Sequence, residues 1–173
     1  SRKRLLVIFR GINTEYFDNS NITNEKVKSF KSLVNFNTEK FKILLPGRLT
    51  RWKGQEMFIE SLKLLKTKYG KENFQAIILG SHQGRTVYFK KLVSMIEKYN
   101  LKNNIFFLQH TKEMPVAYYI SDVVVSSSIE PEAFGRISVE AQAMRRPILA
   151  SDHGISRETI VNGKSGFLFE NEK

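Results

Sequence analysis

The sequence contains no cysteine, and both aspartate and histidine are scarce, with three residues of each. Without cysteine, disulfide bonds and thiolate metal sites are excluded. The histidines (His82, His110 and His153) are widely spaced, and a transition-metal or magnesium cage normally gathers several carboxylate or imidazole ligands. We therefore expect no metal ion held by the protein itself.

Long apolar runs are also missing. No run approaches the roughly 18 to 20 residues that span a bilayer, and the apolar run at residues 5–9 is too short for the core of a signal peptide. We therefore expect a cytoplasmic protein. The 173 residues suffice for one domain with a sizeable core, and 41% apolar with 26% charged residues is typical of a soluble globular chain.

The positive charge is concentrated in the first part of the chain. The formal net charge is +11, and residues 1–100 hold 20 Lys and Arg against 8 Asp and Glu, whereas residues 101–173 hold 8 against 9. A basic segment of this kind favours nucleic acid, anionic lipid or phosphorylated ligands as partners. A lysine-rich solvated surface gives the same composition, so charge alone does not choose between these interpretations.

Short apolar runs alternate with amphipathic stretches along the chain. Most of these runs are continuous, which is typical of strands covered on both faces; the predicted strands are residues 5–9, 42–46, 75–79, 105–108, 123–126, 147–150 and 166–169. The helical pattern predicts helices at residues 55–69, 86–99, 114–121, 135–145 and 156–162. Residues 19–40 do not follow this alternation and are interpreted as a surface loop with a short helix.

This alternation predicts an α/β fold. We expect one Rossmann-like domain over residues 1–173, with a mostly parallel sheet flanked by helices and right-handed crossovers. In such sheets ligands bind beyond the carboxyl ends of the strands. Ligand-binding and catalytic residues are therefore expected in the turns that follow the predicted strands.

The turn PGRLTRWKGQE follows the predicted strand at residues 42–46 and carries two cations, Arg48 and Lys53. Arg48 lies just past the strand, and Lys53 stands with Gly54 at the start of the next helix. Because free N–H groups and the positive dipole end of a helix add to nearby cations, the pattern is typical of an anion site. A solvated loop is the alternative explanation of the same residues.

The turn EPEAFGRISVE follows the predicted strand at residues 123–126 and places Glu132 and Glu140 on either side of Gly135. Eight helical residues span roughly 12 Å, which exceeds the roughly 5 to 9.5 Å between paired glycosidase carboxylates. We therefore interpret the two as hydroxyl acceptors at the ends of an elongated anionic ligand, such as a sugar nucleotide. Gly135 would let the backbone approach that ligand. A helix-capping acid with an unrelated surface glutamate is the alternative.

Three motifs in this order, GRLTRWKG, EAFGRISVEAQAM and PILASDHGISRETIVNGKSGFLF, resemble the nucleotide-sugar-binding half of family 4 glycosyltransferases, which are retaining enzymes of the GT-B fold. The segment VIFRGINTEYF resembles the family's segment that enters this domain, so the resemblance covers nearly the whole chain. It implies a hexosyltransferase that uses a UDP-, GDP- or ADP-sugar donor and a glycan or glycolipid acceptor, in cell-envelope polysaccharide or lipopolysaccharide synthesis.

The resemblance also implies roles for individual residues. Arg48 and Lys53 match the pair that neutralises the departing diphosphate, and Glu132 matches the carboxylate that faces the donor hexose; these three are the expected catalytic residues. Glu140 matches the acceptor of hydrogen bonds from the ribose. Catalysis in the family uses no protein-bound metal for the diphosphate, in agreement with the absence of an Asp-x-Asp pair here.

The remaining binding residues follow from the same resemblance. The backbone of three consecutive residues matches the segment that contacts sugar and phosphate: Phe134, Gly135 and Arg136. Base recognition is expected near Gly80, His110 and Thr111.

Three departures from the family pattern stand out. Gly154 is followed by Ile155 where two adjacent glycines are usual, which puts close backbone approach to the donor there in doubt. Arg10 replaces a more usual Asn. The acceptor-binding N-terminal domain is absent, so we expect a fragment or excised domain that binds donor but transfers little or nothing alone.

Two alternatives have other chemistry. A sugar-nucleotide epimerase of the same fold is disfavoured by the spacing of Glu132 and Glu140 together with Arg48 and Lys53. A non-catalytic nucleic-acid-binding domain fits the basic first half, yet no recognised binding motif of interleaved aromatic and basic residues is present. Within the favoured interpretation we expect no nucleic-acid partner, and the basic first half favours contact with an anionic membrane surface on the cytoplasmic side.

Overall fold

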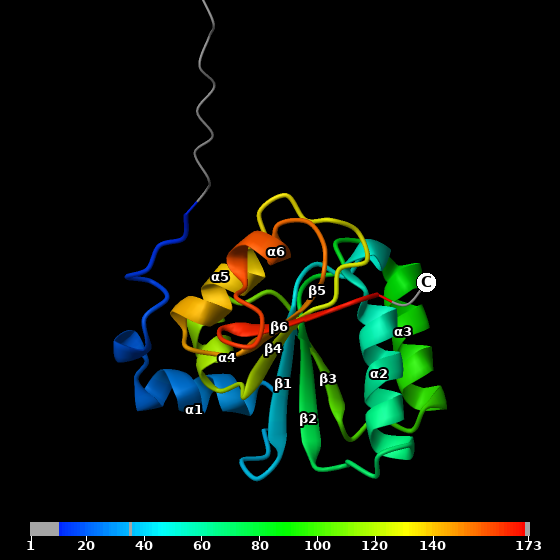
Figure 1. The fold of residues 1–173 in the computed structure, drawn as a ribbon. Helices are drawn as coiled ribbons and strands as arrows, with labels where there is room; N and C mark the ends of the chain where they lie inside the picture. The colour runs from blue at the N-terminus through cyan, green and yellow to red at the C-terminus, as the bar shows by residue number, and fades with distance from the viewer. Residues whose placement is uncertain (1–10, 35, 172–173) are drawn as a thin grey trace, which may run out of the picture.

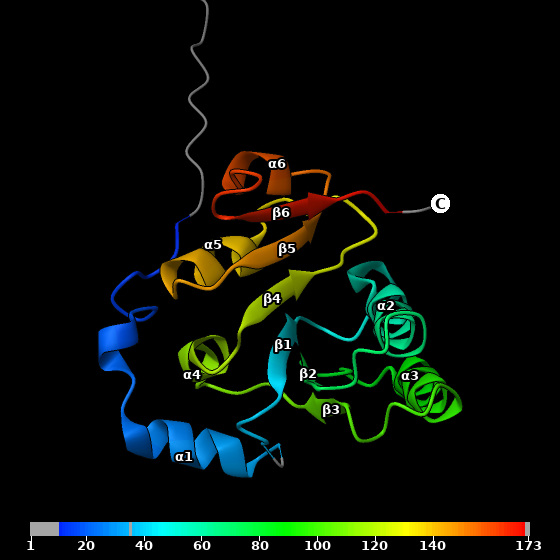
Figure 2. The ribbon, with the colours of Figure 1, turned by 60° about the horizontal axis from the view of Figure 1, so that its bottom comes forward.

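Six parallel strands form the centre of the structure, a computed structural model that describes residues 11–34 and 36–171. Their order across the sheet is β3-β2-β1-β4-β5-β6, so the direction of winding reverses between β1 and β4 (Figure 2). The strands are β1 (Phe41–Pro46), β2 (Phe74–Leu79), β3 (Ile105–Leu108), β4 (Val123–Ser126), β5 (Ile148–Ser151) and β6 (Gly166–Phe169).

Helices cover both faces of this sheet. Helices α2 and α3 lie on one face, and α1, α4, α5 and α6 lie on the other (Figure 1). Their bounds are α1 (Asn24–Ser32), α2 (Gln55–Thr67), α3 (Thr86–Lys98), α4 (Met114–Tyr119), α5 (Arg136–Ala143) and α6 (Ser156–Thr159), with short 3-10 turns η1 (Asn19–Asn21) and η2 (Arg51–Lys53). None of the helices between residues 11 and 171 that the structure describes has both the length and the apolar character to cross a membrane.

A hydrophobic core lies on each face of the sheet, and the strand sequences explain why there are two. Alternate side chains of β1 point to opposite faces, so Leu44 packs in the core beneath α4 and α5 whereas Ile43 and Leu45 pack beneath α2 and α3. Because both faces are covered, the apolar runs are continuous rather than alternating. In α2, Phe58 and Leu62 repeat at four-residue spacing and bury one helix face against the sheet.

Six of the seven predicted strands are confirmed within one residue at each end, and the seventh, residues 5–9, lies outside the described residues, as does Arg10. The predicted helices are present but shorter; the helix predicted to reach residue 162 ends at Thr159, because Ile160 is extended. The surface location predicted for residues 19–40 is only partly right. Phe30 and Val34 are 2% and 3% exposed, because α1 packs against α4 and these side chains are part of the hydrophobic core on that face of the sheet.

Candidate nucleotide-sugar cleft

A polar cleft of about 930 Å³ opens beyond the carboxyl ends of β1 to β4, where the winding of the sheet reverses. This reversal is the position at which open parallel sheets bind ligands. The cleft brings together all ten residues that the sequence singled out, although they come from turns after four different strands. They are Arg48, Lys53, Gly80, His110, Thr111, Glu132, Phe134, Gly135, Arg136 and Glu140.

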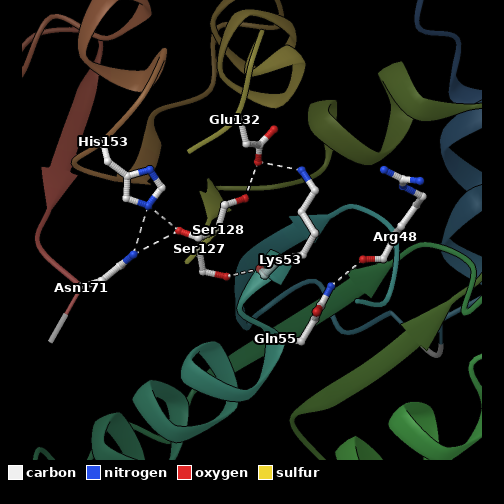
Figure 3. A network of polar contacts seen from close by, with 8 residues as sticks. All are labelled: Arg48, Lys53, Gln55, Ser127, Ser128, Glu132, His153 and Asn171. Atoms are coloured by element: carbon white, nitrogen blue, oxygen red, sulfur yellow. Dashed lines mark hydrogen bonds and ion pairs between the residues drawn. The ribbon is translucent and has the colours of Figure 1, made fainter. Parts of the chain in front are cut away.

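The two cations of the first turn sit on a closely packed backbone. Gly54 adopts φ +70° at the start of α2, and a Cβ there would lie 1.8 Å from the carbonyl oxygen of Ser127. The Ser127 hydroxyl in turn donates to the carbonyl oxygen of Lys53 at 3.0 Å, and the amide of Gln55 donates to that of Arg48 at 2.9 Å (Figure 3). The backbone beneath both cations is therefore fixed by the end of β4 and by α2.

Both cations of this turn lie near the ring of Trp52. The Lys53 ammonium is 4.4 Å and the Arg48 guanidinium 5.8 Å from the centre of the indole ring. The negative face of an aromatic ring attracts cations, so Trp52 offsets part of the repulsion between two like charges held close together. Both cations line the cleft, so an anion bound there can reach positive charge.

The two carboxylates of the second turn each pair with a cation. Lys53 Nζ lies 2.6 Å from Glu132 Oε1, with both side chains mostly buried, and the hydroxyl of Ser128 donates to the same oxygen. Arg136 Nη2 lies 2.8 Å from Glu140 Oε1, one helical turn away. Arg48 makes no ion pair with any residue in the part of the chain that the structure describes, so its exposed guanidinium remains available to a ligand.

Glu140 is held from below by a buried tyrosine. The Tyr118 hydroxyl donates to Glu140 Oε2 at 2.8 Å, and Tyr118 is fully buried beneath α5. Burial, followed by the Glu140 charge, raises the pKa of Tyr118 well above its usual value, so the hydroxyl stays protonated and donates throughout the physiological pH range. Tyr118 therefore fixes the Glu140 carboxylate at the wall of the cleft.

The structure gives a different reason for the glycine at position 135 from the one expected from the sequence. It begins α5 with φ +64°, and a Cβ there would lie 2.6 Å from a methyl group of Ile155. Ile155, which replaces the second glycine of the family pattern, is buried and fills the space behind this turn. Glycine is thus required at 135 by backbone conformation and by packing, and the expected close approach of a ligand stays a prediction.

The opposite wall comes from the ends of β2 and β3. Gly80 follows β2 and donates its N–H to the carbonyl oxygen of Leu108 at 2.8 Å. His110 and Thr111 follow β3 and line the same cleft, with His110 exposed. The structure therefore places the three residues expected for the base together, across two adjacent strands.

Sequence reasoning missed three residues that position the cleft: Trp52, Tyr118 and Ser128. Trp52 lies inside the first turn quoted above, and Ser128 lies two residues before the second, so their places in and beside the motifs were the available signal. Tyr118 gave no signal, because its contact with Glu140 joins two different helices. In the part of the chain that the structure describes, no three His, Asp or Glu side chains gather as a metal site.

A second cavity, of about 670 Å³, lies between α2 and the sheet. Its lining is almost entirely apolar, with side chains such as Ile43, Phe58, Val125 and Leu149 from the sheet and α2. A ligand rich in charge and hydroxyl groups would find few partners there. The polar cleft is therefore the better candidate for chemistry.

Replacing Tyr118 by phenylalanine tests how firmly Glu140 is held. We expect the variant to lose about 1.5 to 3 kcal/mol of unfolding free energy, because a buried carboxylate loses a charge-assisted hydrogen bond while packing is kept. The matched control is Tyr119→Phe, which removes the same atom from the neighbouring exposed residue and should change stability by less than about 0.5 kcal/mol. Chemical denaturation measures both, and equal losses would contradict the assignment.

The fold matches the carboxyl-terminal, Rossmann-like half of a GT-B glycosyltransferase. The family described as "Glycosyl transferases group 1" matches residues 27–173, so the chain belongs to this family. Among curated proteins, it is similar to the capsular polysaccharide biosynthesis glycosyltransferase CapM of Staphylococcus aureus, with 27% identity over 160 residues. That match covers 92% of this chain and 39% of CapM.

Solved structures give the same result. A glycosyltransferase from Rickettsia africae superposes with a TM-score of 0.91 and 34% identity, covering 97% of this chain and 43% of that one. HepE from Anabaena, in complex with UDP-glucose, superposes with a TM-score of 0.83 and 26% identity, covering 95% of this chain and 43% of HepE. The chain thus spans about two fifths of the length of the proteins it resembles.

Proposed function

We propose that the chain is the donor-binding domain of a glycosyltransferase and binds a nucleotide-diphosphate sugar in the polar cleft. The observation that carries this proposal is the convergence, in one cleft, of the cations Arg48 and Lys53 with the carboxylates Glu132 and Glu140. Fixed cations suit a diphosphate, and carboxylates suit the hydroxyl groups of ribose and hexose. The Anabaena structure that superposes on this chain holds UDP-glucose, which supports the same ligand class.

Each residue has a physical role in this proposal. Arg48 and Lys53 stabilise the negative charge that develops on the departing diphosphate, in a cleft whose fixed charges need no reorganisation. Glu132 accepts a hydrogen bond from the hexose, and Glu140, held by Tyr118, accepts from the ribose. The backbone from Phe134 to Arg136 contacts the sugar and the phosphates.

The rest of the donor and the cofactor requirement follow from the same assignment. The base lies against Gly80, His110 and Thr111, at the far end of the cleft from Glu132. The departing diphosphate is neutralised by side chains, with no metal ion held by the protein, and no cofactor takes part other than the donor itself.

The transfer reaction itself is proposed for a protein of the length of the relatives, of which this chain would be one domain. We propose that it transfers a hexose with retention of anomeric configuration, as a family 4 enzyme, to a glycan or glycolipid acceptor in cell-envelope polysaccharide or lipopolysaccharide synthesis. The similarity to CapM, named for capsular polysaccharide biosynthesis, supports this direction. The isolated chain should bind donor and transfer little, because a second domain supplies the acceptor. We place the protein in the cytoplasm, with its basic first half against an anionic membrane surface.

Calorimetric titration of the chain with UDP, GDP and ADP and with their glucose conjugates tests the ligand class. We expect saturable binding of at least one nucleotide, with weaker binding by Glu140→Ala and Lys53→Ala. A short duplex DNA and a single-stranded RNA serve as controls for the nucleic-acid alternative, which predicts tight and strongly salt-dependent binding of either. If no nucleotide binds while nucleic acid does, the proposed function is wrong.

A further inference from the structure

Lys53 and Glu132 neutralise each other in the cleft. Their 2.6 Å ion pair joins a cation assigned to the diphosphate with a carboxylate assigned to the hexose. The side chains are only 12% and 15% exposed, so water screens the pair much less than a surface ion pair. An anion that approaches Lys53 must therefore compete with Glu132.

The geometry leaves one oxygen of Glu132 open. Lys53 and Ser128 both donate to Oε1 (Figure 3). Oε2 has no hydrogen-bonding partner among residues 11–34 and 36–171. A ligand hydroxyl can therefore bind Glu132 without displacing Ser128.

Ser128 is itself firmly anchored. Its carbonyl oxygen accepts a hydrogen bond from His153 Nε2 at 2.8 Å and another from the Asn171 side chain at 3.1 Å. These two donors come from the turn after β5 and from the segment after β6, so Ser128 is fixed to the far half of the sheet (Figure 3). Because Ser128 holds Glu132 from this anchored backbone, the carboxylate keeps its place when the Lys53 side chain moves away.

We propose that Lys53 and Glu132 exchange partners when the donor binds: a hexose hydroxyl donates to the open Oε2 of Glu132, and Lys53 leaves Oε1 for the diphosphate. The exchange rests on the proposed function, since it requires the donor in this cleft. It couples recognition of the hexose to recognition of the diphosphate. A nucleoside diphosphate that lacks the hexose offers Glu132 no hydroxyl there, so Glu132 retains Lys53 and weakens binding of the free leaving group.

Glu132→Gln tests the exchange, because glutamine keeps the shape of the side chain but releases Lys53. The affinity for the free diphosphate and the preference for the sugar-bearing donor should then change in opposite directions. We expect the affinity for inorganic pyrophosphate and for UDP to rise about fivefold, while the preference for UDP-glucose over UDP falls by about tenfold. Isothermal titration calorimetry of the folded variants measures all three ligands. The matched control is Glu130→Gln, which removes an exposed charge from the same loop and should leave all three affinities within about twofold of the wild type.

A second variant separates the exchange from a general loss of negative charge. In a Lys53→Ala background, Glu132→Gln should no longer raise the affinity for pyrophosphate, because no ammonium remains to be released. An unchanged or weaker pyrophosphate affinity in the single variant Glu132→Gln overturns the exchange. If the wild-type chain binds UDP-glucose and only this pattern is absent, the proposed function stands and the exchange alone fails. If pyrophosphate, UDP, GDP, ADP and their glucose conjugates all fail to bind, both are wrong.

Discussion

In the full-length protein, Lys53→Ala is expected to lower kcat for glycosyl transfer by about 100- to 1,000-fold. This is the size of effect seen when one preorganised group that stabilises developing transition-state charge is removed. Lys53 has the required placement, because the Ser127 hydroxyl fixes its backbone and its ammonium lies in the cleft beside Glu132. Steady-state kinetics at saturating donor, with product formation followed by release of the nucleoside diphosphate, measures the change.

Arg51→Ala is the matched control for this substitution. Arg51 lies two residues from Lys53 in the same turn, is exposed, and lies outside the lining of the cleft. Its removal changes the net charge by the same amount, so it should alter kcat by less than about threefold at physiological ionic strength. If the two variants lose activity equally, Lys53 acts only through the overall field of the protein, and its proposed role is wrong.

Gly54→Ala, in the turn that carries Lys53, is expected to be strongly destabilising, with a loss of about 3 kcal/mol or more. The left-handed backbone costs an L-residue about 1 to 2 kcal/mol, and a Cβ placed 1.8 Å from the Ser127 carbonyl oxygen forces backbone apart at a further cost of about 1 to 3 kcal/mol. For a chain of this size the melting temperature should fall by roughly 10 °C. Thermal unfolding followed by circular dichroism measures the shift.

Gly163→Ala separates the cost of the left-handed backbone from the cost of the steric clash. Gly163 has nearly the same backbone angle, φ +78°, but no heavy atom lies within 4 Å of a Cβ built there. Only the conformational cost of about 1 to 2 kcal/mol applies, so this variant should lose about half as much stability as Gly54→Ala, or less. Equal losses would show that the contact between the β1 and β4 turns is not tight.

The sequence predicted the strands well because burial on both faces makes each one a continuous apolar run. The ends of helices were less predictable; α6 stops at Thr159 because the chain becomes extended at Ile160, and no glycine or proline marks that point. The location of α1 was misjudged for a related reason. Its apolar residues are few and loosely spaced, and only the packing against α4 shows that Phe30 belongs to the core.

The candidate site was predictable in its members and not in their pairing. Each of the ten cleft residues follows a strand, and parallel strands bring their carboxyl ends to one edge. The pairing of Lys53 with Glu132 joins residues 79 positions apart, and the hydrogen bond from Tyr118 to Glu140 joins two helices. Such contacts depend on crossing angles and side-chain directions that no local pattern in the sequence encodes.

The central claim is that a nucleotide-sugar donor lies in this cleft, with its diphosphate against Arg48 and Lys53. A crystal structure of the chain with bound UDP-glucose, or with whichever nucleotide sugar binds best in the titration, tests it most directly. We predict diphosphate oxygens within hydrogen-bond distance of Lys53 Nζ and the Arg48 guanidinium, ribose hydroxyls on Glu140 and a hexose hydroxyl on Glu132. A donor bound in the apolar cavity beside α2, or one whose diphosphate contacts neither cation, would contradict the account.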